Sequence, residues 1–243
     1  MKNRTENINN LTAFLKIAGT ACGVYCHKNT YCYSVISNSQ WPNRFWLNTA
    51  ADKHIIDEVL NDFYHHEVPM SISYWADFGD PTFKLFERTE LQLKSEQIGM
   101  SVQVPKKKFA TNNRLELHKI RTTELAQLWE ELYPQCFGYV ISARTVESTM
   151  DQINYFLIYH NKVAVGTVST FDTNTVVGIH GMGILPAYRK QGFAKEVLLN
   201  ILNKAVEQEK TLATLQASAM GKAIYKNIGF SEDFLVRNYR ITL

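Results

Sequence analysis

Apolar and polar residues alternate through the second half of the chain in segments separated by turn residues. Such alternation is typical of half-buried strands. Asn161-Lys162 is a two-residue connection between two of these segments, so they are expected to form a hairpin. The predicted strands cover residues 115–121, 153–160, 163–170, 176–185, 211–217 and 234–243.

Between these strands, apolar residues recur every three or four positions, which places them on one face of a helix. Thr122 or Thr123 is positioned to cap the first helix, and Ser218 the last, which Gly229 is expected to end. The predicted helices cover residues 122–136, 191–208 and 218–229, whereas residues 138–152 are expected to be irregular or weakly helical.

The first half has a weaker pattern with a similar order of elements. From Arg44 onward, its strand-helix-strand-helix-strand order repeats that of the second half. The first half is therefore either a degenerate repeat of the second or an unrelated α/β cap. The pattern predicts helices at 8–18, 52–66 and 81–88, a hairpin at 23–27 and 31–37, and strands at 44–47, 71–75 and 97–104.

A charged, polar segment that includes Pro105 and three consecutive lysines separates the two halves at residues 104–114. So short a basic run is more typical of a solvated linker than of a nucleic-acid or targeting patch. We expect an N-terminal α/β domain at residues 1–110 and a second domain at residues 111–243. The predicted fold class is α/β, of the α+β kind: a mixed, mostly antiparallel sheet flanked by helices, with a second, smaller α/β domain.

Composition narrows the range of functions. Of the 243 residues, 45% are apolar and 20% are charged, which is the balance of a globular protein. The net charge of +3, with both signs interspersed, argues against nucleic-acid binding. No run approaches the ~20 apolar residues of a membrane span. At the start, Glu6 and Lys16 interrupt a pattern that otherwise resembles a signal peptide, so an amphipathic helix is the better interpretation.

Three of the four cysteines, Cys22, Cys26 and Cys32, lie close together in sequence, with His27 beside them. Cysteine and histidine are zinc ligands, but the spacing lacks the paired C-x2-C that makes such a prediction strong. We therefore expect buried free thiols and no metal. Reduced thiols fit a cytoplasmic protein, which we expect to be a monomer or a homodimer without nucleic-acid or membrane partners.

The segment from Arg189 to Ala194 follows the strand that Pro186 ends, and it leads into a helix. The first turn of a helix has four N–H groups without intrahelical partners, and these favour a phosphate. Gly192 leaves room for an anion to approach the backbone. The segment predicts a pyrophosphate cradle, although an ordinary β–α turn with a basic rim is the alternative. The first half has a carboxylate, Asp52, at the corresponding helix start, so one cofactor per chain is expected.

Residues 183–194, Gly-Ile-Leu-Pro-Ala-Tyr-Arg-Lys-Gln-Gly-Phe-Ala, resemble the acyl-coenzyme A signature of the GNAT superfamily of N-acetyltransferases. In that family a strand runs into apolar-x-Pro and then Gln/Arg-x-x-Gly-x-Gly/Ala. Residues 215–230, which close with Tyr225-x-x-x-Gly229-Phe230, are similar to the family's later strand-helix segment. The resemblance covers about residues 114–243 and implies a GNAT-type sheet there. It does not by itself cover residues 1–110, which are a degenerate GNAT-like repeat only if the two halves are homologous.

The resemblance implies that acetyl-coenzyme A (acetyl-CoA) is the co-substrate and that an amine attacks its thioester directly in a ternary complex. Backbone groups of Met182, Gly183 and Ile184 would line the pantetheine arm. Ser218 stands where many members have asparagine, so it would hold the cofactor weakly or only cap its helix. The residues expected at the pyrophosphate are Arg189, Lys190, Gln191, Gly192, Phe193, Ala194 and Lys195.

Two residues are catalytic candidates. Tyr225 stands where the family often has a general acid, and a phenol with a pKa of ~10 is a reasonable donor to the departing thiolate. Its alternative role is that of a core aromatic. His180 shares a strand face with Met182 and Ile184, and a histidine is suited to act as a general base. A structural histidine is the alternative.

The acceptor is expected to be a small-molecule amine or a peptide or protein amine, and the first half is expected to wall one side of its cleft. Aromatic residues there either line that pocket or pack in the core: Tyr31, Tyr33, Trp41, Phe45, Trp46, Tyr74 and Trp75. The alternative function is a coenzyme A-binding sensor or partner-binding module whose catalytic centre has decayed.

Overall fold

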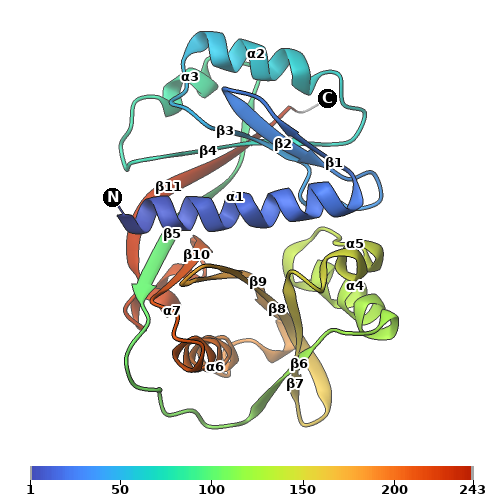
Figure 1. Cartoon of the computed structure of the whole chain (residues 1–243), viewed down its shortest axis with the longest axis vertical. Coiled ribbons are helices and arrows are strands. Elements are labelled where there is room, and N and C mark those ends of the chain that lie inside the picture. The colour runs from blue at the N-terminus through green and yellow to red at the C-terminus, as the bar shows by residue number, and fades with distance from the viewer. Residues whose placement is uncertain (1, 242–243) are drawn as a thin grey trace.

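The computed structural model of the chain describes residues 2–241, and its strands form one continuous sheet (Figure 1). The strands are β1 Val24–His27, β2 Tyr31–Val35, β3 Arg44–Leu47, β4 Ser71–Ala76, β5 Gln92–Gln103, β6 Leu115–Lys119, β7 Asn154–His160, β8 Val163–Thr173, β9 Val176–Ile184, β10 Leu212–Ser218 and β11 Ser231–Arg240. The helices are α1 Lys2–Cys22, α2 Lys53–Phe63, α3 Phe83–Glu87, α4 Thr123–Phe137, α5 Ala143–Thr149, η1 Pro186–Tyr188, α6 Phe193–Glu207 and α7 Lys222–Lys226.

The two halves of the chain exchange their last strands. The order in the sheet is β1-β2-β3-β4-β11-β5-β10-β9-β8-β7-β6. β5 thus lies between β10 and β11, and β11 lies between β5 and β4. Each half also has one parallel pair, β3–β4 and β9–β10, at the corresponding place. This symmetric order is the one that a repeat predicts. The predicted boundary near residue 110 stays a prediction, because exchanged strands join the halves.

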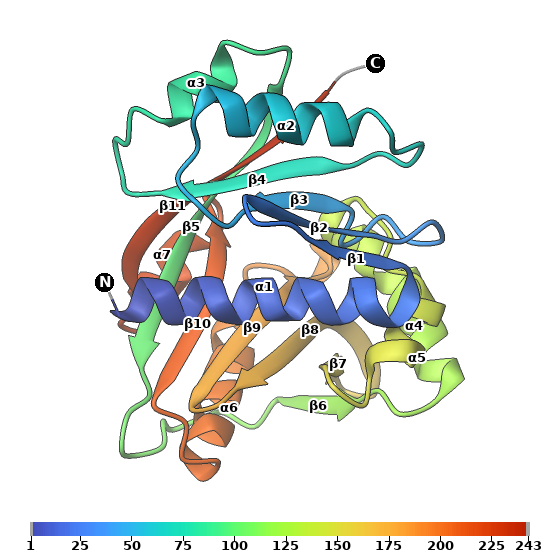
Figure 2. The ribbon, with the colours of Figure 1, turned by 45° about the horizontal axis from the view of Figure 1, so that its top comes forward.

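Helix α1 crosses the middle of the molecule between the elements of the two halves (Figures 1 and 2). It is longer than the predicted segment 8–18, because buried polar residues near its start are bound by the sheet. The Nδ2 of Asn7 donates to Met100 O at 2.9 Å, and that of Asn10 donates to Phe171 O at 2.9 Å. Among residues 2–241, no helix combines the length and the apolar character that crossing a membrane requires.

The remaining helices cover the sheet as the apolar stripes predict. In Figure 1, α2 and α3 lie on the half of the sheet that β1–β4 form, and α6 lies beside β9 and β10. The predicted mixed, mostly antiparallel sheet with flanking helices is confirmed. Helix α5 lies in the segment predicted to be irregular or weakly helical, and the hydroxyl of Ser142 caps it by accepting from Thr145 N at 3.3 Å. β11 starts three residues before the predicted strand 234–243, whose last two residues lie outside the described part.

Candidate active site

The loop before α6 has the backbone that the phosphate-cradle hypothesis requires. The chain turns through η1, and Lys190 and Gly192 then adopt left-handed conformations with φ of 63° and 81°. Gly192 is the N-cap of α6, and no side chain caps this helix start. A Cβ on Gly192 would meet only Arg114 Nη2 within 4 Å, at 3.6 Å. The first N–H groups of α6 are therefore open to an anion.

A buried ion pair that the sequence did not reveal supports this loop. Glu196, 4% exposed, accepts from the backbone N–H of Arg114 at 2.7 Å and from its Nε at 2.9 Å. The same guanidinium donates to the carbonyl of Gln191 at 3.3 Å. Its carbon lies 5.2 Å from the ring centre of Phe193. Arg114 thus fixes the cradle and compensates the charge of Glu196. The one available sequence signal was a carboxylate, Glu196, next to the apolar stripe of α6.

The edge of β9 that faces β10 is unpaired over residues 179–184. The parallel pairing of the two strands ends at Gly178 and Thr214. The N–H of Leu185 donates to Val165 O of β8 at 2.9 Å. Because backbone groups alternate in direction along a strand, those of Met182 and Ile184 point away from β8 and toward the open edge. The carbonyl of Ile184 accordingly accepts from Arg189 Nε at 2.9 Å.

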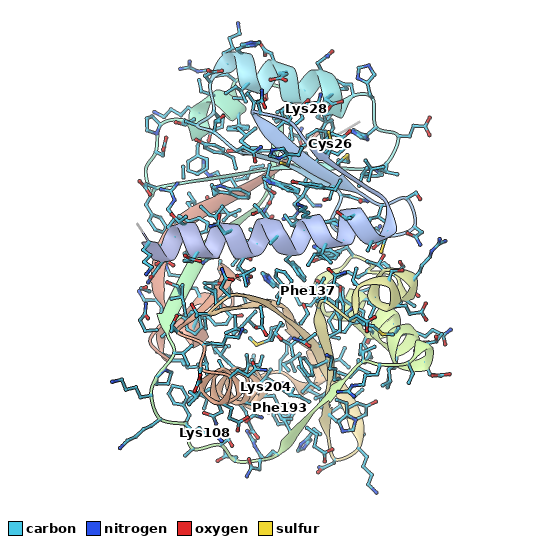
Figure 3. All side chains as sticks on the ribbon, in the orientation of Figure 1. Cys26, Lys28, Lys108, Phe137, Phe193 and Lys204 are labelled. Carbon is cyan, nitrogen blue, oxygen red and sulfur yellow. The ribbon has the colours of Figure 1, made fainter. Side chains whose placement is uncertain are left out.

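The end of α4 packs closely on the same stretch of β9. A Cβ on Gly183 would lie 2.7 Å from Cys136 Cβ and 2.8 Å from the ring of Phe137. Phe137 lies just below α1 in Figure 3. Burial raises the pKa of the Cys136 thiol to about 11. Glycine at position 183 therefore lets α4 approach the strand and form one wall of the site.

Tyr225 and Ser218 lie on the opposite side of the open edge, in α7 and at the end of β10. The ring of Tyr225 packs edge-on against Phe230, with centroids 5.8 Å apart. Burial raises the pKa of Tyr225 to about 12. The hydroxyl of Ser218 accepts from Gly221 N at 3.3 Å, so it shapes the turn into α7.

His180 is buried beneath α1. Its ring stacks on Phe14 with centroids 4.2 Å apart, and its Nε2 lies 3.1 Å from Asn10 Oδ1. Burial lowers the pKa of His180 to about 3. The amide nitrogen of Asn10 already donates elsewhere, so Asn10 Oδ1 accepts from the Nε2–H of a neutral imidazole. The role of His180 as a general base stays a prediction, and so low a pKa argues against it.

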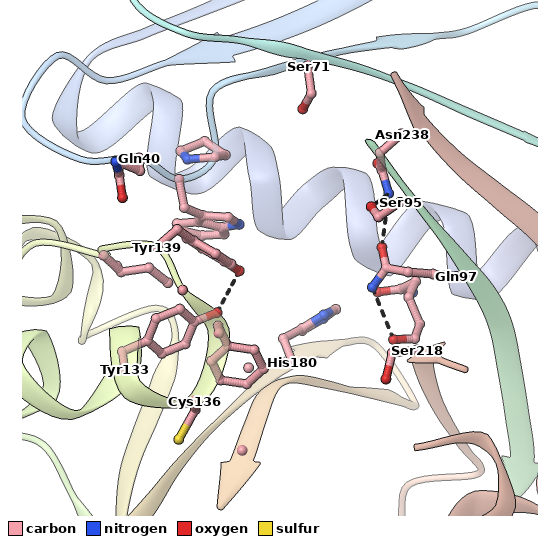
Figure 4. A pocket seen from close by; sticks show the side chains of 18 of the residues that line it. Gln40, Ser71, Ser95, Gln97, Tyr133, Cys136, Tyr139, His180, Ser218 and Asn238 are labelled. Atoms are coloured by element: carbon pink, nitrogen blue, oxygen red, sulfur yellow. Dashed lines mark hydrogen bonds between the residues drawn. The ribbon is translucent and has the colours of Figure 1, made fainter. Parts of the chain in front are cut away.

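A cavity of about 1870 Å³ joins these features, and both halves of the chain line it. In the view of Figure 4, Tyr133 and Tyr139 lie on one side of His180, and Ser95, Gln97 and Asn238 on the other. Of the aromatic residues proposed for a pocket in the first half, Trp41 lines the cavity. The predicted site residues that line it are His180, Met182, Gly183, Ile184, Arg189, Lys190, Gly192, Phe193, Ala194, Lys195, Ser218 and Tyr225; Gln191 does not.

The cysteine cluster lies outside this cavity. The four cysteines are free thiols, but the expectation that they are buried is correct only for Cys32, because Cys22, Cys26 and Cys136 are partly exposed. The sulfur of Cys32 lies 2.9 Å from His27 Nδ1 on the neighbouring strand. Across residues 2–241, no group of three or more His, Cys, Asp or Glu side chains is placed to hold a metal ion.

Comparisons with known proteins agree with this geometry. A family model for the acetyltransferase (GNAT) domain matches residues 117–238. A solved GCN5-related N-acetyltransferase from Kribbella flavida has a TM-score of 0.69 at 14% identity, over 98% of this chain and 96% of that chain. A GCN5-related N-acetyltransferase from Sphaerobacter thermophilus has a TM-score of 0.63 at 12% identity, over 87% and 76%.

A tandem GNAT protein from the clavulanic acid biosynthesis pathway has a TM-score of 0.58 at 8% identity, over 98% of this chain and 95% of that chain. No curated protein matches the sequence. At such low identities the solved structures share the fold with this chain, and that fold extends over both halves.

Proposed function

The chain belongs to the GNAT acetyltransferase family, and we propose that it transfers an acetyl group from acetyl-CoA to an amine by direct attack in a ternary complex. The observation that carries the proposal is the unpaired edge of β9, which leads to the uncapped start of α6 at Gly192. An extended pantetheine arm can hydrogen-bond along that edge as a strand would, and the pyrophosphate can bind the α6 N–H groups.

The residues proposed to bind acetyl-CoA contribute in different ways, some through backbone groups and others through basic side chains. Met182 and Ile184 offer backbone groups to the pantetheine, and the Ile184 N–H can stabilise the oxyanion of the attacked thioester. Gly183 contributes close packing rather than hydrogen bonds. Phe193 is 2% exposed, so it offers its backbone N–H alone. Besides the N–H groups of Gly192 and Ala194, basic side chains contribute at the pyrophosphate, namely Arg189, Lys190 and Lys195.

Direct attack is favoured over an acyl-enzyme intermediate. Cys136 is the thiol that lines the cavity beside Gly183. A thiol with a pKa near 11 is protonated at neutral pH and is a poor nucleophile. The acetyl group therefore passes from the cofactor sulfur to the amine in one transfer.

Tyr225 is proposed to assist the departing thiolate. With its pKa near 12 it stays a phenol at neutral pH and can donate a hydrogen bond to sulfur. Full proton transfer to a thiolate whose conjugate acid has a pKa of about 8.5 would cost roughly 5 kcal/mol. Tyr225 therefore acts mainly by stabilising the developing charge. We expect Tyr225→Phe to lower kcat by roughly 10- to 100-fold, the size of a lost hydrogen bond to a charged group.

Calorimetry with acetyl-CoA tests cofactor binding. Gly192→Glu should abolish binding, because it puts a side chain on a residue with φ of 81° and a carboxylate at the anion site. Gly79→Glu is the matched control, because Gly79 has φ of 80°, has nothing within 4 Å of an added Cβ, and does not line the cavity. Unchanged binding of acetyl-CoA by Gly192→Glu would contradict the proposal.

A coenzyme A-binding sensor without turnover is the second candidate, favoured by the low pKa of His180, which leaves the site without an evident base. A panel of amines, assayed by release of free thiol, separates the two functions. Binding of acetyl-CoA without turnover of any amine would favour the sensor, whereas turnover that Tyr225→Phe reduces would exclude it.

A further inference from the structure

Three basic side chains line the end of the cavity to which β3, β5 and β11 contribute. They are Arg44 at the start of β3, Lys94 in β5 and Arg240 at the end of β11. None of the three forms an ion pair with a carboxylate of residues 2–241. Arg44 donates through Nε to Pro42 O at 3.2 Å, which leaves its two terminal nitrogens for a ligand.

The three charges lie close enough to affect one another. Burial lowers the pKa of Lys94, and the nearby charges of Arg44 and Arg240 lower it further. Burial also lowers the pKa of Arg44, which remains a cation at neutral pH. Arg44 is half-buried, whereas Lys94 and Arg240 are exposed, so it is mainly the mutual repulsion of the three cations that favours the binding of an anion between them.

The acidic residues of this region compensate only part of that charge. Glu67 and Glu96 line the same cavity. Glu96, however, accepts from Nε of Arg237, a residue outside the cavity lining, at 3.0 Å. Glu67 is thus the one unpaired carboxylate beside three cations at this end of the described cavity.

The cationic end is continuous with the expected reaction centre. Arg44 is electrostatically coupled to Tyr133 and Tyr139, whose hydroxyls lie 2.7 Å apart. A Cβ on Gly181 of β9 would lie 3.0 Å from the ring of Tyr133. Tyr133 therefore contacts β9 close to its open edge and, with Tyr139, lies near enough to Arg44 to affect its charge.

The opposite wall is polar and ordered. Ser73 donates to Asn238 Oδ1 at 2.6 Å, and Asn238 donates to Ser95 at 3.1 Å and to Gln97 at 3.2 Å. These residues lie on β4, β11 and β5, which are neighbours because the halves exchange strands. Such a wall suits a hydrophilic ligand better than an apolar one.

We infer that the acceptor amine carries an anionic group, a carboxylate or a phosphate, which Arg44 binds together with Lys94 and Arg240 while the amine faces Ile184. This inference rests on the proposed acetyl transfer and adds the class of acceptor. A guanidinium with both terminal nitrogens free binds either anion in a two-pronged geometry.

Matched pairs of acceptors test it in a thiol-release assay with acetyl-CoA. The carboxylate arm compares the amino acids with their α-amides. The phosphate arm compares glucosamine 6-phosphate and phosphoethanolamine with glucosamine and ethanolamine. We expect kcat/KM to be higher for the anionic member of at least one pair, and the arm in which this occurs identifies the anion. Equal or higher kcat/KM for every neutral member would overturn the inference.

Substitutions of the basic residues then test which side chains cause the preference for an anionic acceptor. Arg44→Gln should lower kcat/KM for the preferred anionic acceptor by about 10- to 100-fold, the size of a lost charged hydrogen bond. Its KM for acetyl-CoA and its activity on the neutral partner should not change, and Lys94→Gln should act in the same direction. Arg121→Gln removes the same charge from an exposed residue outside the cavity and should change nothing. An equal loss on both acceptors would indicate a structural role for Arg44 and overturn the assignment.

Failure of the proposed acetyl transfer can be distinguished from failure of the acceptor inference. If acetyl-CoA does not bind, the transfer proposal fails, whatever Arg44 does. If acetyl-CoA binds but no amine is acetylated, product binding tests the inference instead. N-acetylated amino acids and N-acetylglucosamine 6-phosphate are then titrated into the protein–coenzyme A complex by calorimetry. Binding of an anionic product that Arg44→Gln removes supports the inference, and no preference over the neutral product overturns it.

Discussion

Glu196 is a buried carboxylate in the first turn of α6, whose start is expected to bind an anion. Its charge is compensated by Arg114, so Glu196→Gln should leave that guanidinium without its partner and loosen the loop. We expect the free energy of unfolding to fall by roughly 2 kcal/mol, measured by urea denaturation. Glu207→Gln removes an exposed carboxylate paired with Lys108 near the end of the same helix and should have no measurable effect. Equal stability of the two variants would contradict this account.

His180 should make the protein less stable in mild acid. Its pKa is about 3 when folded and about 6.5 in the unfolded chain, so below pH 6.5 the unfolded state takes up a proton that the folded state does not. The free energy of unfolding should fall by about 2 kcal/mol between neutral pH and pH 5 on this account alone. His66, whose pKa burial also lowers, adds to the loss with the same sign.

His180→Asn should flatten that pH dependence in urea titrations, whereas His54→Asn, at an exposed position, should not. If the free energy of unfolding of His180→Asn falls with pH as steeply as that of the wild type, protonation of His180 does not cause the loss of stability.

These residues show what the sequence reveals about a site and what it does not. Gly192 and Pro186 were predictable because a turn and a helix start demand particular backbone conformations over a short span. The partnership of Glu196 with Arg114 joins residues far apart in sequence, and no local pattern encodes it. The environment of His180 was equally hidden, because the side chain that binds it, Asn10, lies in α1.

At the scale of elements, the exchange of β5 and β11 ties the halves together. β5 pairs with β10 over residues 212–218 and with β11 over residues 231–240. A fragment of residues 111–243 would lack the strand between β10 and β11 and would expose two sheet edges. We expect this fragment to show no cooperative unfolding by circular dichroism, and mixing it with residues 1–110 to restore a cooperative transition.

A monomeric fragment 111–243 that unfolds cooperatively by itself would contradict this prediction.

The strands themselves were predictable from alternation and turn residues, since both act locally. Their partners were not, because β5 carries the same pattern whether it pairs with β4 or with β10. The order of elements suggested a repeat, but pairing across the halves depends on packing of the whole sheet.

At the scale of the molecule, two similar halves could in principle hold two cofactors, and their local differences argue for one. Asp52 caps helix α2, and its carboxylate accepts from Ile55 N at 2.8 Å. At the corresponding position of α6 stands Gly192, without a side-chain cap. An anion at the start of α2 would meet a carboxylate that already binds the N–H group. β3 also pairs with β4 over residues 44–46 and ends at Leu47, so it lacks the long open edge of β9.

Calorimetry should therefore give one acetyl-CoA per chain, and Gly192→Glu should remove that single site completely. Apart from Arg189, Lys190 and Lys195 at the α6 loop, the arginines and lysines that line the described cavity are Arg44, Lys94 and Arg240. If they held a second cofactor rather than an anionic acceptor, the stoichiometry would be two, and Gly192→Glu would retain one site that Arg44→Gln weakens. One site in the wild type and none in Gly192→Glu leaves the cationic end free for the acceptor. This outcome is expected when one half of a repeat keeps the loop that binds the cofactor and the other half has a carboxylate at the corresponding position.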